Sequence, residues 1–394
     1  MGNPVAVVNA GSSTVKFSLL NGERRVFDAL LDRLGSTSAN GACASLHDAQ
    51  GAPLFQGPIP ADNHEDALIW LFDWLARAGD GCKPAAVGHR VVHGGDGLTR
   101  PVKVTGEIIE KIEALIPLAP LHQPHNLAPI RLLAAKFPDI PQVACFDTAF
   151  HASQSAVERR FALPREYEAA GIRRYGFHGL SYEYVAARLA EIDPCAADGR
   201  TIVCHLGNGA SLCAMKNGRS VATTMSFTAL DGIPMGTRCG AIDPGVLLHL
   251  MTRPGMDAAT LSDLLYKRSG LLGLSGLSGD MRDLLASDRP EAAEAVEYFC
   301  YRIAREIGSL TAALGGLDAL VFTAGIGEHA APVRARICEL STWLGVAIDP
   351  AAYPILHTPD SRIHVLVVST DEEAMIARHV RRTLGLPQGS PRSL

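Results

Sequence analysis

The sequence predicts an α/β protein with two domains built around repeated β-hairpins. Its 394 residues exceed what one core usually organises, since about 150 residues is typical of a domain. Hydrophobic residues make up 47% and charged residues 20%, as in globular chains. Strand-like and helix-like segments alternate along the chain, which is the pattern of an α/β fold. The sequence therefore predicts two α/β domains, with a boundary expected near residue 150.

The hairpins point to an internal repeat. Residues 5–20 and 201–216 each form an apolar strand, a small-residue turn and a second strand, and an Asn-Gly pair follows each segment. Gly11 and Gly207 are 196 positions apart (207 − 11), and the two Asn-Gly pairs have the same offset (217 − 21). A duplicated domain explains this offset. A chance match over a short segment is the alternative.

The other elements follow from hydrophobic periodicity and end signals. Helices are predicted at residues 64–78, 105–116, 181–192, 243–251, 258–267, 291–314, 332–340 and 372–384, with Ser181 as the N-cap of the third. Strands are predicted at residues 85–92, 142–146, 319–323 and 363–368. The expected domains are 1–150 and 151–371, with a C-terminal helix at about 372–386 that packs back on the first domain and a loose tail at 387–394.

Charge and cysteine content exclude several classes of function. The formal net charge is −5 and the arginines are dispersed, so no basic surface is expected for nucleic acid or an anionic membrane. No apolar run reaches the roughly 20 residues that cross a bilayer, and no basic leader precedes the first strand. The nine cysteines form no CxxC pair and no zinc-ligand spacing. We therefore expect a cytoplasmic protein with reduced thiols that binds small molecules.

Three glycine-rich turns follow apolar strands and are suited to phosphate binding. They lie at residues 9–16, 206–211 and 322–329. Small residues allow backbone N–H groups to approach phosphate oxygens, and Thr14 and Lys16 add a hydroxyl and an ammonium group. The first turn is not a Walker A loop, because the GxxxxGK[ST] spacing is absent. For any single turn, a tight hairpin without a ligand is the alternative.

Charged side chains and histidines gather at predicted strand ends and loops. Arg90 ends a strand, where its planar guanidinium can hold a carboxylate or phosphate through two hydrogen bonds. Arg238 lies on a glycine-flanked loop before a helix, a position suited to a transferring phosphate. Histidines and Asp147 occur in the segments 118–125, 145–151 and 175–179. A lone histidine is usually a core residue, but several beside an acid and an arginine favour a site.

Two predicted helices begin with acidic residues. Asp280 and Arg282 fit the recognition of a hydroxyl or a base. Glu372 begins the last helix, where a carboxylate usually complements the helix dipole, and a metal-binding role is the alternative.

Ten ordered blocks of the sequence resemble the acetate kinase family, over residue 5 to about 380. The blocks are VVNAGSSTVKFSLL, VGHRVVHGG, PLHQPHN, CFDTAFH, YGFHGLSY, HLGNGAS, GTRCGAIDPG, SGDMRD, FTAGIGE and STDEEAMIARH. The resemblance implies reversible phosphorylation of acetate to acetyl phosphate with ATP/ADP and Mg²⁺, for which Mn²⁺ can substitute. It also implies a duplicated actin/hexokinase/Hsp70-like (ribonuclease H-like) fold with ATP in a cleft between two domains, a homodimer, and a place in acetyl-CoA biosynthesis.

The resemblance also implies the site residues. The catalytic residues would be Asp147, His178, Arg238, Arg90 and His122. Arg90 would hold the acid's carboxylate, and its alkyl end would contact Val92, Leu121, Phe177 and Pro234. Mg²⁺ would contact Asn9 and Glu372. The nucleotide and its phosphates would contact Thr14, Lys16, His205, Leu206, Gly207, Asn208, Gly209, Asp280, Met281, Arg282, Gly325, Ile326, Gly327, Glu328 and His329. The chain departs from the family's usual residues at His329, Gly279 and Ala241, which bears on nucleotide affinity and base preference.

Elementary chemistry narrows the role of Asp147. A simple carboxylic acid has a pKa near the roughly 4.3 of Glu, so the acceptor is already ionised at pH 7 and needs no general base. Asp147 is therefore interpreted as a group that positions water, Mg²⁺ or an arginine. Domain closure would exclude water from the labile acyl phosphate product.

Three other functions compete with acetate kinase. Propionate kinase stays open, because one methylene changes discrimination by only about 1–3 kcal/mol. A nucleotide-gated binding module would not require Arg90, His178 and Arg238 beside an acid. A sugar kinase would require a general base and a polar substrate pocket.

Overall fold

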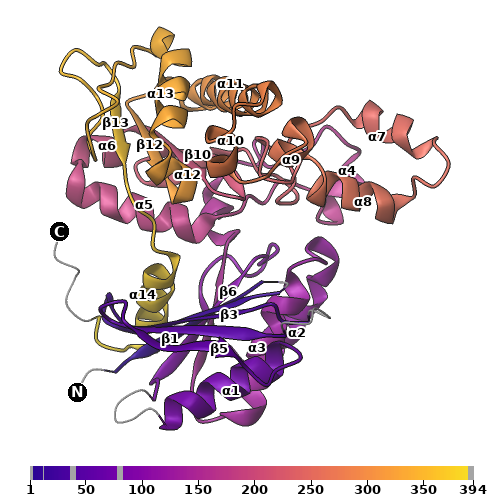
Figure 1. The fold of residues 1–394 in the computed structure, drawn as a ribbon, viewed down its shortest axis with the longest axis vertical. Coiled ribbons are helices and arrows are strands. Elements are labelled where there is room, and N and C mark those ends of the chain that lie inside the picture. Colours follow the sequence, from indigo (N-terminus) through magenta and orange to yellow (C-terminus); the bar gives the residue numbers. More distant parts are fainter. Residues whose placement is uncertain (1–2, 12, 36–40, 78–82, 389–394) are drawn as a thin grey trace. The chain divides into compact units, whose positions relative to one another are not determined.

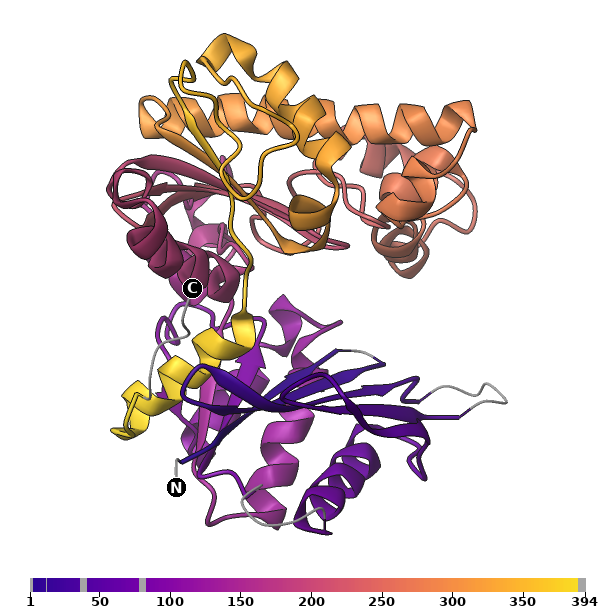
Figure 2. The same cartoon turned by 60° about the vertical axis from the view of Figure 1, so that its left-hand side comes forward.

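The computed structural model describes residues 3–11, 13–35, 41–77 and 83–388, which form two compact units (Figures 1 and 2). Unit 1 comprises Met1–Ala149 and Asp371–Leu394, and unit 2 comprises Phe150–Thr370. Of the expected tail, residues 389–394 lie outside the described residues. Within the described part of the chain, no helix has both the length and the apolar character needed to cross a membrane.

Unit 1 contains an eight-stranded sheet in the order β5-β4-β3-β2-β1-β6-β8-β7. The strands are β1 Val5–Ala10, β2 Val15–Asn21, β3 Arg24–Asp32, β4 Cys43–Asp48, β5 Pro53–Pro58, β6 Ala86–Val91, β7 Val102–Lys103 and β8 Gln142–Phe146. The first hairpin is antiparallel, whereas β6 runs parallel to both β1 and β8. The carboxyl ends of β1, β6 and β8 therefore meet at one edge of the sheet.

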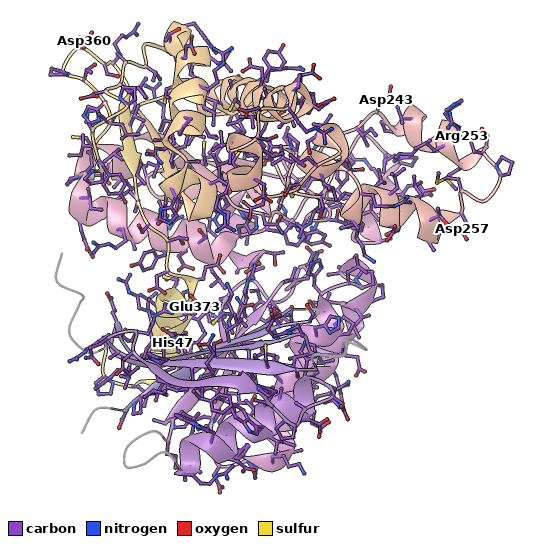
Figure 3. The ribbon with its side chains drawn as sticks, in the orientation of Figure 1. His47, Asp243, Arg253, Asp257, Asp360 and Glu373 are labelled. Atoms are coloured by element: carbon purple, nitrogen blue, oxygen red, sulfur yellow. The ribbon has the colours of Figure 1, made fainter. Side chains whose placement is uncertain are left out.

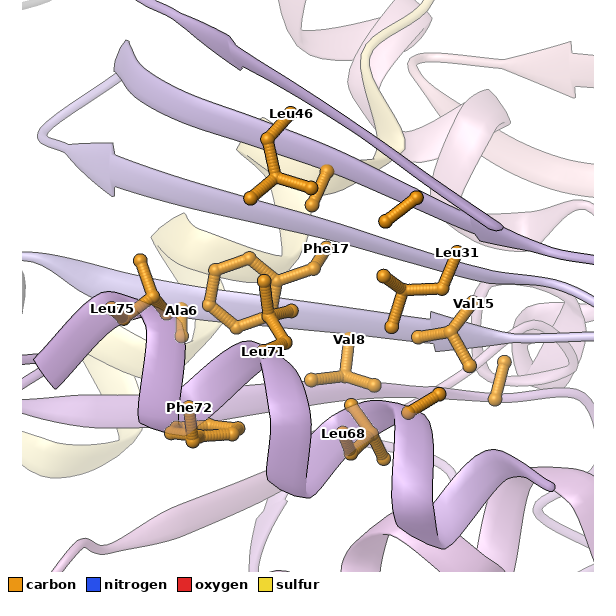
Figure 4. Packing of buried hydrophobic residues seen from close by; sticks show 14 of the residues in the cluster. Ala6, Val8, Val15, Phe17, Leu31, Leu46, Leu68, Leu71, Phe72 and Leu75 are labelled. Atoms are coloured by element: carbon orange, nitrogen blue, oxygen red, sulfur yellow. The ribbon is translucent and has the colours of Figure 1, made fainter. Parts of the chain in front are cut away.

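Helices cover both faces of this sheet. They are α1 His64–Arg77, α2 Gly106–Ala114, α3 Gln123–Lys136 and α14 Glu372–Leu384, with the 3₁₀ helix η1 Ile116–Leu118. On one face, Leu68 and Leu71 of α1 pack against Phe17 in the apolar core (Figure 4). On the other face, a Cβ at Gly88 would lie 2.4 Å from Ile376 Cγ2 of α14. Gly88 thus allows α14 to lie close to β6, at the strand that carries Arg90.

Unit 2 contains a five-stranded sheet in the order β11-β10-β9-β12-β13. The strands are β9 Arg200–Leu206, β10 Ala210–Lys216, β11 Arg219–Thr223, β12 Ala319–Thr323 and β13 His364–Val367. Its pairing is antiparallel from β11 to β9 and parallel from β9 to β13. The strands β3-β2-β1-β6-β8 of unit 1 have the same order and directions. The duplicated α/β fold predicted from the sequence is confirmed.

The helices of unit 2 differ from the prediction most clearly at Ser181 and in the turn at residues 322–329. They are α4 Arg165–Ala169, α5 Gly179–Ile192, α6 Pro194–Asp198, α7 Pro244–Met251, α8 Ala258–Lys267, α9 Gly270–Ser275, α10 Met281–Leu285, α11 Pro290–Leu314, α12 Ala324–His329 and α13 Ala331–Leu340. Two 3₁₀ helices are η2 Ala149–Ser153 and η3 Thr342–Leu344, and η2 begins at the last residue of the first segment of unit 1. The prediction of Ser181 as an N-cap was wrong: His178 is the N-cap, and the Ser181 hydroxyl hydrogen-bonds to His205 Nδ1 at 2.8 Å instead. The glycine turn predicted at 322–329 contains a short helix, α12, which Ala324 enters with φ 65°.

Candidate active site

The residues implied by the sequence divide between the two units. Unit 1 carries Asn9, Thr14, Lys16, Arg90, Val92, Leu121, His122, Asp147 and Glu372, and unit 2 carries the others.

Arg90 and Asp147 form the centre of the unit 1 site. Asp147 follows β8 directly, and its backbone N–H donates to the Val91 carbonyl at 3.0 Å, which continues the β6–β8 ladder. Arg90 donates from Nη2 to Asp147 Oδ2 at 2.6 Å and from Nε to Oδ1 at 3.0 Å. Because two parallel bonds join the planar groups, the guanidinium has a defined orientation. Asp147 is buried, so the pair lies in a medium that strengthens this attraction.

The first hairpin adds polar groups beside this pair. Asn9 lies directly opposite Lys16 in the β1–β2 register, and Asn9 Oδ1 accepts from Arg90 Nη1 at 3.4 Å. Lys16 is exposed. The turn between the strands closes through a bond from the Gly11 N–H to the Thr14 carbonyl at 2.8 Å. The hairpin thus brings a carboxamide next to Arg90 and places an ammonium group opposite Asn9 on the neighbouring strand.

Glu372 makes this region strongly acidic. Its Oε2 atom lies 3.5 Å from Arg90 Nε, and Figure 3 shows the neighbouring Glu373 at the start of α14. Burial raises the pKa of Glu372 to about 7, because desolvation and the carboxylates of Asp147 and Glu373 outweigh the attraction of Arg90. Burial alone would lower the pKa of Arg90, but the carboxylates of Asp147 and Glu372 raise it overall. Arg90 and Lys16 thus offset the neighbouring carboxylates only in part, and the pKa of Glu372 stays raised, a balance that favours an additional cation.

The apolar residues expected around the substrate differ in burial. Val92 follows β6 and is buried, with its backbone N–H donating to Asn126 Oδ1 at 2.9 Å. His122 is half-buried and precedes α3, whereas Leu121 is 44% exposed. In unit 2, Phe177 and Pro234 are both buried.

In unit 2, His178 and Arg238 both approach Gly209. A Cβ on Gly209 would lie 3.5 Å from His178 Nε2 and 3.6 Å from Arg238 Nη1. The His178 ring is fixed by a 2.8 Å hydrogen bond between Nδ1 and Ser211 Oγ and stacks on His205 with 4.2 Å between ring centroids. His178 also has a left-handed backbone, with φ 57°, which is costly for a side chain larger than Gly. The fold thus holds an imidazole and a guanidinium next to one glycine turn.

A cavity of about 560 Å³ lies in unit 2. The implied nucleotide residues that line it are Gly207, Asn208, Asp280, Met281, Arg282, Gly325, Ile326 and His329, and its other lining residues are Gly279, Leu285 and Ala330. The implied residues of unit 2 outside this lining are His205, Leu206, Gly209, Gly327 and Glu328, and Thr14 and Lys16 belong to unit 1. Glu328 Oε1 instead accepts from the Ala324 N–H at 3.0 Å, at the start of α12. At the exposed rim, hydrogen bonds from Arg282 lower the pKa of Asp280 to about 2.

The loop that carries Arg238 packs directly on the wall of this cavity. The Gly236 N–H donates to the Asn208 carbonyl at 3.0 Å. A Cβ on Gly279 would lie 2.8 Å from the Gly236 carbonyl oxygen, closer than real Cβ atoms come to such an atom. A glycine is therefore required at 279 by the path of this loop.

Comparison with known proteins identifies the family. A model described as the acetokinase family matches residues 4–378. The chain belongs to the acetokinase family. It is therefore an enzyme, a phosphotransferase with a carboxyl group as acceptor.

Relatives and solved structures of the acetokinase family match nearly the whole chain. The acetate kinase of Rhodopseudomonas palustris strain CGA009 is 51% identical over 395 residues, covering 97% of this chain and 98% of the relative. That of Methylocella silvestris is 48% identical and covers 96% and 97% of the two chains. The structure of Porphyromonas gingivalis acetate kinase matches with TM-score 0.89, 38% identity and coverage of 97% and 100%. A propionate kinase structure from Francisella tularensis matches with TM-score 0.90, 35% identity and coverage of 96% and 99%.

Several polar residues around the site of this acetokinase were not predicted from its sequence. Ser211 orients His178, and Asn126 bonds the backbone beside Arg90. Both lie inside blocks that carried the resemblance, HLGNGAS and PLHQPHN, but a side chain that bonds only protein atoms gives no chemical signal in the sequence. Their positions in those blocks were the one available indication.

Proposed function

We propose that this acetokinase transfers the γ-phosphoryl group of ATP to acetate and forms acetyl phosphate and ADP reversibly. The observation that carries the proposal is the bidentate Arg90–Asp147 pair, which fixes a cation at a strand end in a chain of this family. A carboxylate oxygen forms a bond to the γ-phosphorus as the bond to the β-phosphate oxygen breaks, and ADP leaves with that oxygen. No proton is removed from the acid, because it is already ionised at neutral pH.

The two units contribute different groups to this proposal. In unit 1, Arg90 offers Nη1 and the remaining face of its guanidinium to the acid's carboxylate, while Asp147 keeps it oriented. In unit 2, the nucleotide binds in the cavity, and His178 and Arg238 stabilise the charge that spreads over the phosphoryl oxygens. We accordingly propose that unit 2 is the nucleotide-binding domain. Fixed donors of this kind reduce the repulsion between two anionic substrates.

Mg²⁺ fits the groups present in unit 1. Asn9, Asp147 and Glu372 supply the oxygen donors that Mg²⁺ prefers, and the pKa of Glu372 is raised by burial and, in addition, by the carboxylates of Asp147 and Glu373. In the described residues, no cluster of three or more His, Cys, Asp or Glu side chains is arranged to hold a metal alone. Mg²⁺ usually combines one or two protein carboxylates with substrate phosphates, so these donors would hold it together with the nucleotide. When bound, the ion would neutralise phosphate charge.

The reaction is tested by trapping the acyl phosphate with hydroxylamine. Purified protein is assayed with ATP and Mg²⁺ against acids from formate to butyrate. We expect trapped acyl phosphate that requires ATP and Mg²⁺, with the highest kcat/KM for acetate. Propionate kinase is the second candidate, favoured by the match to the Francisella tularensis structure, and a higher kcat/KM for propionate would establish it. No product with any acid would contradict both.

Enlarging the acid pocket at Val92 should change substrate preference. Val92 is buried beside Arg90, so Val92→Ala should open space for about one methylene group. We expect the ratio of kcat/KM for propionate over acetate to rise by about 10-fold, the scale of one methylene in an apolar pocket. Steady-state kinetics with both acids measure this ratio. An unchanged ratio would place Val92 outside the pocket or indicate collapse of its neighbours into the space.

Restoring the family's usual asparagine at position 279 should weaken nucleotide binding. The new Cβ would collide with the Gly236 carbonyl oxygen, and overpacking of this kind typically costs about 1–3 kcal/mol. We expect Gly279→Asn to raise the Kd for ADP by at least about fivefold, measured by titration calorimetry. Gly276→Asn is the matched control and should leave the Kd for ADP within about twofold, because Gly276 lies outside the cavity lining, a Cβ there meets no atom within 4 Å, and asparagine tolerates its left-handed backbone. Tighter ADP binding by Gly279→Asn would contradict the packing shown here.

We also propose that the enzyme is a cytoplasmic homodimer. No disulfide joins any of the eight cysteines within the described residues, as in a reducing compartment. Helix α7 has no buried residue although it is rich in leucine, and Leu248 is 70% exposed. Asp243 and Arg253, labelled in Figure 3, flank this helix, so antiparallel pairing with a second copy would set opposite charges facing each other. Sedimentation velocity of the purified protein tests this, and a monomer at micromolar concentration would contradict it.

A further inference from the structure

The backbone ladder between β1 and β6 stops just before the site. The last paired residues in this parallel register are Val8 and His89. The next residues along the two strands are Asn9 and Arg90, the carboxamide and guanidinium of the unit 1 site. On the other side of β6, the ladder to β8 continues to Val91 and Phe146. The pairing of β6 with β8 thus includes Arg90, opposite Cys145, whereas the pairing of β6 with β1 ends before Asn9 and Arg90 would pair.

The side chain of Asn126 spans this gap. Its Nδ2 donates to the Ala10 carbonyl at 2.8 Å, and its Oδ1 accepts from the Val92 N–H at 2.9 Å. Asn126 is buried, at 3% exposure, so neither backbone group has water as an alternative partner from this direction. The amide donates to one strand and accepts from the other, as a peptide group would in the ladder. Asn126 therefore replaces the missing backbone bonds beyond Asn9 and Arg90.

The helix that carries Asn126 is itself bonded to the same strand end. Gln123, one turn earlier in α3, donates from Nε2 to the His93 carbonyl at 2.9 Å. Gln123 is fully buried, and burial lowers the pKa of His93 to about 4, so the imidazole next to this contact is neutral at physiological pH. Two amides spaced i, i+3 thus face the residues that follow β6. This arrangement fixes α3, and hence Asn126, relative to Arg90.

We propose that Asn126 is a positioning residue that sets the separation of Asn9 and Arg90. This inference rests on the proposed function, because it assigns the two strand ends to the acid and phosphate side of the reaction. Asn126 does not bind the substrate itself. It acts through the backbone of Ala10, which follows Asn9, and of Val92, which lies two residues after Arg90. Its loss should therefore change the kinetics of the acid and leave the nucleotide cavity of unit 2 unaffected.

The decisive variant is Asn126→Asp, which keeps the shape and the accepting oxygen. The introduced carboxyl group, when ionised, cannot donate to the Ala10 carbonyl and would oppose it, whereas the protonated acid can donate. We expect about a tenfold or greater loss of kcat/KM for acetate at pH 8, with a raised KM, because small displacements at reacting groups are costly. Burial favours the protonated form, so the ratio of variant to wild-type kcat/KM should rise toward pH 6. In this ratio, the pH dependence that comes from groups present in both the variant and the wild-type protein cancels.

Two controls separate positioning from general damage. Gln142→Glu introduces a carboxylate at a buried amide of the same sheet, bonded to His89 at 2.7 Å at the start of β8, and should leave the KM for acetate within about twofold. The Kd for ADP should equal the wild-type value in Asn126→Asp and in Gln142→Glu. Asn126→Ser, which cannot span both backbone groups, should show the acetate defect without the recovery at pH 6, and it serves if Asn126→Asp does not fold.

The experiment distinguishes a failure of the positioning role of Asn126 from a failure of the proposed acetate kinase reaction. An inactive wild-type protein would contradict the acetate kinase reaction itself. With active wild type, normal acetate kinetics in Asn126→Asp at pH 8 would overturn the positioning role. A loss that is equal at every pH, or that is matched by weaker ADP binding, would also overturn it, since either result indicates unspecific destabilisation.

Discussion

Arg238→Ala is expected to lower kcat by about 10²–10³, with a much smaller change in the KM for either substrate. The guanidinium lies against Gly209 next to His178 Nε2, and its Nη1 donates to the Ala229 carbonyl at 3.0 Å. A donor held in place by the backbone of its own loop is suited to charge that grows in the transition state. Such an interaction contributes little to the ground state, so its loss appears in kcat.

Replacement by lysine tests the geometry of this donor. Arg238→Lys should recover little of the lost kcat, because a point charge does not reproduce the planar fork of donors. Arg268→Ala is the matched control: Arg268 is exposed on unit 2 and pairs with Asp263 at 2.8 Å, and its loss should change kcat by less than about twofold. Single-turnover kinetics would show whether the chemical step is the one that slows. A kcat for Arg238→Ala within about threefold of wild type would remove Arg238 from the mechanism.

The sequence predicted the elements that have strong local signals. The two hairpins with Asn-Gly turns and the helices with regular apolar spacing, such as Ala258–Lys267, occur where expected. Strands β3 to β5 were missed, because their residues include many polar and exposed positions and their order depends on pairing along the sheet edge. Helix α5 begins two residues before Ser181, because a buried contact to His205 uses the hydroxyl that was expected to cap it. Tertiary contacts thus override local end signals.

The sequence predicts a site residue only where the residue type and its position indicate ligand binding. An arginine or histidine at a strand or turn edge suggests a ligand, so Arg90 and His178 were predicted as site residues from their types and positions. The bonds that orient them involve Asp147, Ser211 and Asn126, and these depend on which strand ends meet. Position 279 requires a glycine because the Gly236 carbonyl lies close to it, and that contact depends on the path of a loop distant in the sequence. Such pairings require three-dimensional structure, because no spacing in the sequence encodes them.

Asp147→Asn is expected to lower kcat severely, by about 10² or more, at every pH from about 5.5 to 8. The variant loses the charge that faces Arg90, and an amide accepts through only one of the two bonds that now fix the guanidinium. Removing one partner of a buried ion pair also typically costs about 3–5 kcal/mol, so unfolding should be measured alongside activity. Asp147→Glu keeps the charge and should retain part of the activity. Asp28→Asn is the matched control, since it removes another arginine's carboxylate partner in unit 1, at Arg25.

The pH dependence of this defect separates the two roles considered for Asp147. A general base would be needed only while the acid is protonated, so the defect of Asp147→Asn would shrink as pH rises from about 5 to 7 and the acid ionises. A residue that positions Arg90 is needed whether or not the acid is ionised. The structure favours positioning, because the Asp147 carboxylate is already bound to Arg90 through both oxygens. We therefore expect the ratio of variant to wild-type kcat to stay flat with pH, together with a raised Mg²⁺ requirement. A near-normal variant, or a defect that disappears toward pH 7, would show that the positioning role is wrong.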